Sequence, residues 1–571
     1  MNRIFSLTKE NRFAILVFTS LLVIVVGTYY QLFSTFYQQD EWLALGRMMV
    51  EPVFAYFSHF SLLALIGGGA RFISYPLQYI MYRIAPFQIV QFAFFSIVFH
   101  FFNAALFYLL AKEMTKSRFI AVISGLFFAT ASIGSQAVTW NSASVPTLLS
   151  TFFLFLSLIL YFRSIEKPTK KLFYTSVALG IVSFLFKEST YFIFILLPLV
   201  SYLFSKENNS FLSIVHKHRI LVGYGTVSIL AKLANLFFVY QGETTGFVTR
   251  NSYPLFRLAS HFILYPVEAF SQIFIHPTAL WSISNFLGMT NYQRLWDTEQ
   301  AIVAVQTIGG ELVSWIFSTA FIAFFCLLYV CSKQYRKVLM FSLVFFVLSF
   351  MAYAPLDKTN AYLESRYYYV GVSAMAIIVG ISMYVLRNWA TEKLKISYSS
   401  ASFIGLLFII IFSYFQIQHI HTLLEKDIQI AHERKQFLSM LNTAVPVLPE
   451  SPIFYLDGSH DYYVAHNKAP FQQGTGYTLM VWYYKSGKIP ANFLQEPFLW
   501  DITSEGYKQT QGKGFGYFHD MNNLKESLKS NQLPLTAIVG LYYDSENKRL
   551  INITEQVRNE IIKDDSSDST L

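Results

Sequence analysis

The feature that most constrains this chain is a series of long apolar segments that recurs from the N-terminus to about residue 418. A helix needs about 20 apolar residues to cross about 30 Å of hydrocarbon. The series predicts an all-α polytopic membrane domain with about 11 transmembrane helices. The segments lie at residues 13–33, 88–111, 118–138, 145–162, 172–186, 190–204, 219–240, 311–332, 337–354, 367–386 and 400–418.

Composition argues against other classes of protein. Hydrophobic residues make up 54% of the 571 residues and charged residues 13%, which does not suit a string of soluble domains. The net charge of +9 does not indicate nucleic-acid binding, because the basic residues form short clusters between apolar segments. The cysteines, Cys326 and Cys331, lie in one apolar segment and cannot build a disulfide framework.

The lysines and arginines between the segments predict the orientation of the chain. If the segments alternate in direction, every basic cluster falls on the same side, which the positive-inside rule makes cytoplasmic. The N-terminus is therefore expected in the cytoplasm, and an odd number of spans places the last quarter of the chain outside. The clusters are Lys9 and Arg12; Lys112, Lys116 and Arg118; Arg163, Lys167, Lys170 and Lys171; Lys206, Lys217 and Arg219; Lys333, Arg336 and Lys337; Arg387, Lys393 and Lys395.

One apolar segment, at about 258–275, would break this alternation if it crossed the membrane. It carries His261, Pro266, Glu268 and Gln272. We interpret it as an interfacial or re-entrant helix that is buried against protein, where polar groups at membrane depth are tolerated.

The pattern changes after residue 418 and predicts a second domain. Apolar residues at helical spacing continue to Asn442, and short strand-like runs follow at 452–456, 478–484 and 535–543. We expect a small soluble α/β domain at 419–571, outside the cytoplasm, after a membrane domain at 1–418. The glycine-rich run at 512–516 matches no phosphate-binding motif and is interpreted as a loop.

Charged residues at the outer ends of the predicted helices are the candidate functional positions, because charge near the membrane is costly unless it is paired or used. They are Asp40 and Glu41, Lys187 and Glu188, Glu364 and Arg366, and Arg71. Each also has a structural interpretation. Asp40 and Glu41 could form a solvated helix start, and Lys187 and Glu188 a local ion pair. Glu364 and Arg366 could be an interface anchor, and Arg71 a lipid-headgroup contact.

Two further groups of polar residues have mainly structural interpretations. His100 and Asn103 are three residues apart and share a helix face, which favours a hydrogen-bonded contact between helices. Asp457, His460, Asp461 and His466 lack the fixed spacing of a metal motif. No metal site is predicted, and a divalent metal stays an open alternative.

One carboxylate together with several cations suits a particular reaction. Hydrolysis of a glycosidic bond normally needs two carboxylates, because the leaving alcohol must be protonated. A phosphate leaving group needs positive charge instead, which Lys187 and Arg366 supply, and an acceptor hydroxyl needs one general base, such as Asp40. The arrangement fits sugar transfer from a lipid-phosphate donor.

In these residues and their order, the sequence resembles the GT-C superfamily of membrane glycosyltransferases. Within it, the sequence resembles the branch that contains protein O-mannosyltransferases and their bacterial relatives. The resemblance covers about residues 35–370 and follows the family's order. It rests on Asp40-Glu41, Arg71 with Ser74 to Pro76, His100 with Asn103, Ala137 to Trp140, Lys187-Glu188, and Glu364 to Tyr369.

The resemblance implies an inverting glycosyltransferase that moves a hexose, such as mannose, from a polyprenyl-phosphate donor to a protein or glycan acceptor. Asp40 would be the catalytic base, with Glu41 as the alternative. Lys187, Arg366 and Arg71 would bind the donor phosphate, and Glu188, Glu364, His100 and Asn103 would support them. The protein would be an integral component of a bacterial cell membrane.

A transporter or flippase of a lipid-linked glycan is the alternative from another class. Transporters more often carry internal repeats and bind substrate near the middle of the bilayer. Most charged candidates here lie at one outer face, which favours an enzyme.

Overall fold

A computed structural model describes residues 9–38, 41–50, 71, 73–205, 211–239, 255–288, 299–354, 362–459, 475–483 and 506–568 of the chain. The chain divides into two compact units. The first unit contains Met1–Tyr30, Phe60–Leu77 and Phe92–Thr422, and the second contains Gln31–His59, Gln78–Gln91 and Leu423–Leu571.

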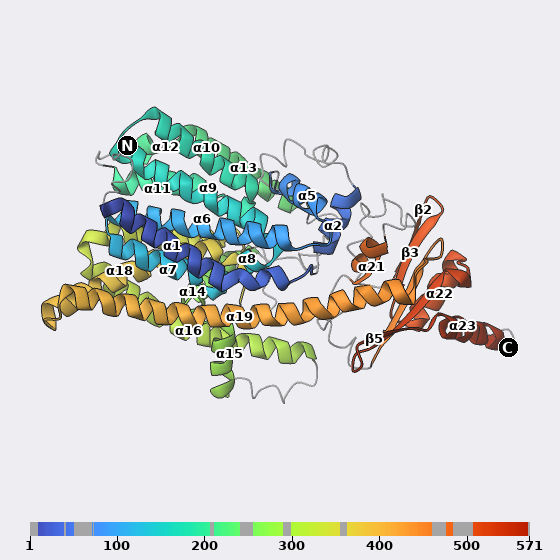
Figure 1. The fold of residues 1–571 in the computed structure, drawn as a ribbon. Helices are drawn as coiled ribbons and strands as arrows, with labels where there is room; N and C mark the ends of the chain where they lie inside the picture. Colours follow the sequence, from blue (N-terminus) through green and yellow to red (C-terminus); the bar gives the residue numbers. More distant parts are fainter. Residues whose placement is uncertain are drawn as a thin grey trace, which may run out of the picture. The chain divides into compact units, whose positions relative to one another are not determined.

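Every predicted apolar segment is helical in the structure. By length and hydropathy, 7 helices in the described ranges can cross a membrane, or 8 if one bent pair is a single span, so the chain is an integral membrane protein. The remaining segments fall on shorter apolar stretches, such as α10 and α11 with 17 and 12 residues. The helices are α1 (Lys9–Tyr29), α6 (Val90–Thr115), α7 (Arg118–Thr130), α9 (Asn141–Glu166), α10 (Lys170–Phe186), α11 (Ile193–Phe204), α13 (Arg219–Val239), α16 (Glu299–Cys331), α17 (Arg336–Met351), α18 (Tyr369–Lys393) and α19 (Tyr398–Ala444) (Figure 1).

The predicted segment 118–138 is a broken helix. The chain bends by 49° between α7 and the residues Ser132–Thr139, which contain the short helix α8 (Gln136–Thr139). Ala131 adopts an extended conformation at the break, and Trp140 is extended again before α9 begins. The bend interrupts the regular helix within an apolar stretch, and the residues that follow it are mostly buried, so they can hold a neighbouring segment through hydrogen bonds.

The segment predicted to be interfacial or re-entrant forms a single helix, α14 (Leu255–Gln272), with Pro266 inside it. Its polar side chains His261, Glu268 and Gln272 are buried, as expected for a helix that packs against protein. Trp315 of α16 donates its indole N–H to Glu268 Oε1 at 3.3 Å. The next helix, α15 (Pro277–Phe286), also packs against α16.

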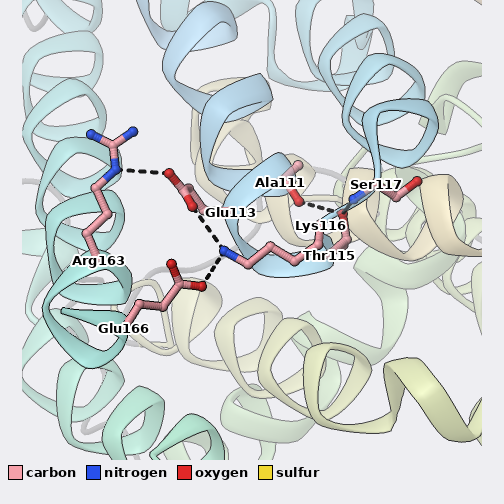
Figure 2. Close-up of polar contacts among 7 residues, drawn as sticks. All are labelled: Ala111, Glu113, Thr115, Lys116, Ser117, Arg163 and Glu166. Carbon is pink, nitrogen blue, oxygen red and sulfur yellow. Dashed lines mark hydrogen bonds and ion pairs between the residues drawn. The ribbon is translucent and has the colours of Figure 1, made fainter.

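Charges from two loops that were predicted to share a side meet at one end of the first unit (Figure 2). Lys116, after α6, forms ion pairs with Glu113 and with Glu166 at the end of α9. Arg163 of α9 donates its Nε–H to Glu113 Oε1 at 2.9 Å. The connections α6–α7 and α9–α10 therefore lie at the same end of the helix bundle.

The second unit contains an α/β domain with a five-stranded sheet in the order β2-β3-β1-β4-β5. The central strand β1 runs parallel to both β3 and β4, and the edge strands β2 and β5 are antiparallel to their neighbours. The strands are β1 (Ile453–Gly458), β2 (Gly506–Thr510), β3 (Lys513–Phe518), β4 (Ile538–Asp544) and β5 (Arg549–Asn552).

Helices cover both faces of this sheet. On one face, α22 (Met521–Asn531) and α23 (Thr554–Asp568) enclose an apolar core that includes Ile453, Phe518 and Ile538. On the other, Phe454 stacks on Tyr483 of α21 (Thr475–Tyr483), and Phe437 of α19 contacts Tyr543.

The described residues also form the α-helices α2 (Glu41–Val50), α5 (Ser74–Ile84) and α12 (Phe211–Lys217).

Two predictions for this domain were wrong. In the run 478–484, the described residues 478–483 belong to helix α21 and not to a strand, because a short apolar run has no period that separates the two. The glycine-rich run 512–516 is part of a β-hairpin and not a loop. Its turn residues Gln511 and Gly512 have φ of 50° and 74°, the left-handed conformations that suit a tight hairpin. In addition, α19 continues through residue 418 without a break.

Candidate anion-binding site

The side chain of Lys187 is buried at the point where α10 ends. Lys187 has an extended backbone, so its side chain leaves the helix direction and is only 5% exposed. Its ammonium donates to Thr147 Oγ1 of α9 at 2.7 Å. An ammonium has three N–H donors, and no second partner of Nζ occurs among the described residues. Two donors of a buried cation are thus available for a ligand.

Arg71 reaches the same place from the residues before α5. Its Nε lies 3.6 Å from Glu188 Oε2, and both side chains are about one third exposed. Arg71 has a φ of 44°, and its carbonyl accepts the N–H groups of Ser74 and Tyr75. This left-handed turn at the start of α5 fixes the position of the Arg71 backbone, from which its side chain extends toward Glu188.

Arg366 is held in the short 3-10 helix η6 (Ser365–Tyr367) before α18. Its guanidinium lies 4.1 Å from the ring centroid of Trp140 and donates to Tyr367 Oη at 3.0 Å. It also forms an ion pair with Glu364. Stacking on an aromatic face stabilises a guanidinium while leaving its edge open to carboxylate or phosphate.

The broken helix α7–α8 holds η6 in place. Ser365 Oγ donates to the carbonyl of Ile133 at 2.5 Å, and the Arg366 N–H donates to Gln136 Oε1 at 3.3 Å. Both acceptors belong to the residues that follow the bend at Ala131. The bend therefore positions Arg366 and supplies Trp140.

The electrostatics of the site favour an anion. Burial, together with the positive charges of Arg71 and Arg366, lowers the pKa of Lys187 to about 7, although Glu188 opposes this shift. Three cations face the two carboxylates of Glu188 and Glu364. An anionic ligand would remove the excess of positive charge and favour the charged form of Lys187.

Two residues of this site were not identified from the sequence. Thr147 lies in the apolar helix α9, where a threonine gives no signal of its own. Tyr353, after α17, is buried, hydrogen-bonds Ser189 and has its ring 4.3 Å from that of Tyr367.

His100 and Asn103 make a buried contact between helices. His100 Nδ1 lies 2.8 Å from Tyr369 Oη and its Nε2 lies 3.0 Å from the carbonyl of Ala129. Asn103 donates to Tyr369 Oη at 3.2 Å and to the carbonyl of Leu148 at 2.9 Å. Tyr369 follows the Glu364–Arg366 segment, so this cluster fixes the start of α18.

We expect Tyr369→Phe to lower the free energy of unfolding by about 1–3 kcal/mol, because two buried polar side chains lose a common partner. The midpoint of thermal unfolding of the purified protein in detergent measures the effect. Tyr174→Phe, at an exposed tyrosine, is the matched control. Equal midpoints for both variants would contradict the role of the Tyr369 hydroxyl.

The acidic pair belongs to the second unit. Asp40 lies outside the described residues. Glu41 begins α2, is fully buried, and accepts the Gln38 N–H at 2.8 Å, while the Glu41 N–H donates to the Gln38 carbonyl at 3.1 Å. The contact of the Glu41 carboxylate with a backbone N–H three residues earlier is the acidic half of a helix capping box, which gives the carboxylate a structural task.

No metal centre is built by the described residues, which contain no group of three or more His, Cys, Asp or Glu side chains placed to hold an ion. Of the four residues that resembled ligands, Asp457 ends β1, and His460, Asp461 and His466 lie outside the described ranges.

Comparison with known proteins finds distant structural similarity. No family model and no curated protein match the chain. ArnT from Cupriavidus metallidurans bound to undecaprenyl phosphate is similar with a TM-score of 0.36 and 13% identity over 93% of both chains. The apo state of the same protein gives a TM-score of 0.34 and 13% identity over 94% of both chains. At this level of similarity, the chemistry of the site decides which function is proposed.

Proposed function

We propose that the chain is a GT-C-type glycosyltransferase that transfers a sugar from a polyprenyl-phosphate donor to an acceptor hydroxyl. The observation that carries the proposal is the buried ammonium of Lys187 with two unused N–H donors, beside Arg71 and Arg366. These are the groups that bind a phosphate and stabilise it as it leaves the sugar.

Phosphate suits this site better than a carboxylate or a neutral sugar. A phosphate monoester or diester presents several acceptor oxygens, which match an ammonium and two guanidinium groups that approach from different elements. A neutral sugar would leave the positive charge uncompensated in a buried site, which is costly. The leaving phosphate needs no protonation, so the site needs no acid.

We propose Asp40 as the general base that accepts the proton of the acceptor hydroxyl, with Glu41 as the alternative. The capping contact between Glu41 and Gln38 supports this order, because it commits the Glu41 carboxylate to a backbone N–H. Transfer by direct attack of the acceptor on the sugar would invert the anomeric centre. The phosphate would leave on the polyprenyl chain.

The topology proposed for the enzyme follows from its basic clusters. The loops that carry Lys116 and Arg163 would face the cytoplasm, and the anion-binding site and the α/β domain would face the other side. A polyprenyl donor would then enter from the lipid. We propose a bacterial cell membrane as the location, a hexose such as mannose as the sugar, and a protein or glycan as the acceptor.

Purified protein in lipid nanodiscs, incubated with a panel of polyprenyl-phosphate hexoses and candidate acceptors, tests the function. Mass spectrometry should detect transfer of one hexose, with release of polyprenyl phosphate in equal amount. If a labelled lipid-linked glycan instead crosses the bilayer of proteoliposomes and no sugar is transferred, the chain is a transporter or flippase. Addition of EDTA to the same assay tells whether a divalent metal contributes.

A further inference from the structure

Arg387, near the end of α18, has a buried guanidinium that no carboxylate neutralises. The residue is only 4% exposed. Its Nε and Nη2 donate to Asn388 Oδ1 at 3.3 and 3.1 Å, and its side chain also hydrogen-bonds Tyr384, so its acceptors are an amide and a phenol. Unlike Arg163 and Arg366, Arg387 forms no ion pair within the described residues. A buried charge is costly unless an opposite charge accompanies it, so the position of Arg387 needs a reason beyond packing.

Three aromatic rings from three helices surround the Arg387 guanidinium. Its Cζ lies 4.5 Å from the ring centroid of Phe119 in α7, 4.4 Å from that of Tyr384 in α18 and 4.2 Å from that of Tyr398 in α19. Stacking stabilises a guanidinium without neutralising its charge, and its N–H groups can still bind a phosphate at two oxygens. Tyr398 is 58% exposed, so the ring on this side of the guanidinium lies at the surface of the protein.

The surroundings of this guanidinium add positive charge. Phe119 is the second residue of α7 and Tyr398 the first of α19, so two helix N-termini, which carry partial positive charge, lie beside it. Lys393, in the last turn of α18, is exposed. Glu392 is exposed as well, and no ion pair joins its carboxylate to the guanidinium in the part of the chain that the structure describes. The local charge therefore favours an anion.

The Arg387 guanidinium lies at the end of the first unit that holds the ion pairs of Figure 2. Its contact Phe119 follows the connection between α6 and α7, where Lys116 and Ser117 are drawn. Lys187 lies at the opposite end of α10, a helix of 17 residues that is about 25 Å long. The surroundings of Arg387 are therefore separate from the anion-binding site described above.

Apolar side chains next to Arg387 are exposed. Leu386 and Trp389 are three residues apart, share a face of α18, and are 49% and 52% exposed. In a protein that crosses a membrane, such a face contacts hydrocarbon, and tryptophan is typical of the boundary with the headgroups. A phosphate bound to Arg387 could thus belong to a lipid whose acyl chains follow this face.

We propose that Arg387, together with Phe119, Tyr384 and Tyr398, binds the phosphate group of an anionic lipid. The lipid supplies the negative charge that the protein does not, and a guanidinium matches two oxygens of one phosphate. Basic sites between transmembrane helices on the cytoplasmic side are typical of anionic headgroups, and the proposed topology places Arg387 on that side. The binding does not depend on sugar transfer, and it would join α7, α18 and α19 through one lipid.

Lipid binding is tested on the full-length protein in detergent by native mass spectrometry. The protein is titrated with phosphatidylglycerol, which is anionic, with phosphatidylcholine, which has no net charge, and with inorganic phosphate. Arg387→Gln removes the buried charge, and Lys393→Gln makes the same charge change at an exposed position in the last turn of the same helix. The midpoint of thermal unfolding without added lipid checks that each variant is folded.

We expect the wild type to prefer phosphatidylglycerol to phosphatidylcholine, and Arg387→Gln to lower the affinity for phosphatidylglycerol by about 10-fold. Lys393→Gln should change that affinity by less than about twofold, because its charge is exposed. Phosphatidylglycerol should raise the unfolding midpoint of the wild type and of Lys393→Gln but not of Arg387→Gln. An arginine with a purely structural role would leave this lipid-dependent rise unchanged when it is replaced.

Equal affinities of the wild type and Arg387→Gln for phosphatidylglycerol would overturn the inference. A wild type without preference for phosphatidylglycerol over phosphatidylcholine would also overturn it, and this measurement needs no variant of Arg387. Inorganic phosphate that binds as tightly as phosphatidylglycerol and displaces it would make free phosphate the ligand and exclude the lipid. None of these results bears on the proposed glycosyltransferase activity, which is measured separately.

Discussion

Replacing Asp40 with asparagine is expected to reduce the rate of sugar transfer by about 100- to 10,000-fold, the range that a positioned general base contributes. Asparagine keeps the size of the side chain but cannot accept the proton of the acceptor hydroxyl. The assay is single-turnover transfer from a polyprenyl-phosphate hexose, with donor binding measured in parallel. Donor affinity should change little, because the phosphate contacts are made by other residues.

Glu41→Gln is the matched control at the neighbouring position. The amide still offers an oxygen to the Gln38 N–H, so we expect most of the activity to remain, with a loss of stability of about 1 kcal/mol or less. Full activity of Asp40→Asn together with an inactive Glu41→Gln would make Glu41 the base.

Replacing Lys187 with glutamine should weaken donor binding by about 100-fold, because a buried cation that contacts the phosphate is lost. Acceptor binding should change much less. The pH dependence is a sharper test. With a pKa of about 7, Lys187 is cationic below that pH and loses its charge above it, so donor affinity of the wild type should fall as the pH rises past 7.

Two comparisons check the assignment of Lys187. Lys187→Arg keeps its charge at every accessible pH, so the fall in donor affinity should disappear in that variant. Lys171→Gln, at the exposed start of the same helix, should leave donor affinity unchanged. Equal losses of donor and acceptor binding in Lys187→Gln would argue against a phosphate contact.

Much of the fold is predictable from hydropathy, and the exceptions have physical causes. The bend at Ala131 has no glycine or proline at the break, so the segment 118–138 reads as one helix although it is two. The hairpin turn begins with Gln511, a residue that rarely adopts a positive φ. Residues 478–483 suit a buried strand, but packing places them in α21.

The candidate site was accessible from sequence only where charge interrupts an apolar pattern. Lys187, Glu188 and Arg366 are conspicuous for that reason, and the structure brings them together with Arg71. Thr147 and Tyr353 are ordinary residues for a membrane protein, and only the fold reveals that one bonds the Lys187 ammonium and the other lies beside Glu188. His100 and Asn103 contact Tyr369 and no member of the anion-binding site among the described residues.

The ion pairs of Figure 2 have a consequence for how the protein is made. In the topology proposed above, Lys116 and Arg163 would act as topological signals during insertion, since the translocation machinery responds mainly to positive charge. In the finished protein, Glu113 and Glu166 neutralise the same two side chains. The Lys116–Glu166 and Arg163–Glu113 pairs each join one helical hairpin to the other, so they would form after both hairpins are inserted. The charges that would orient each hairpin in the membrane also join the two hairpins to each other, so insertion and final assembly would use one set of residues.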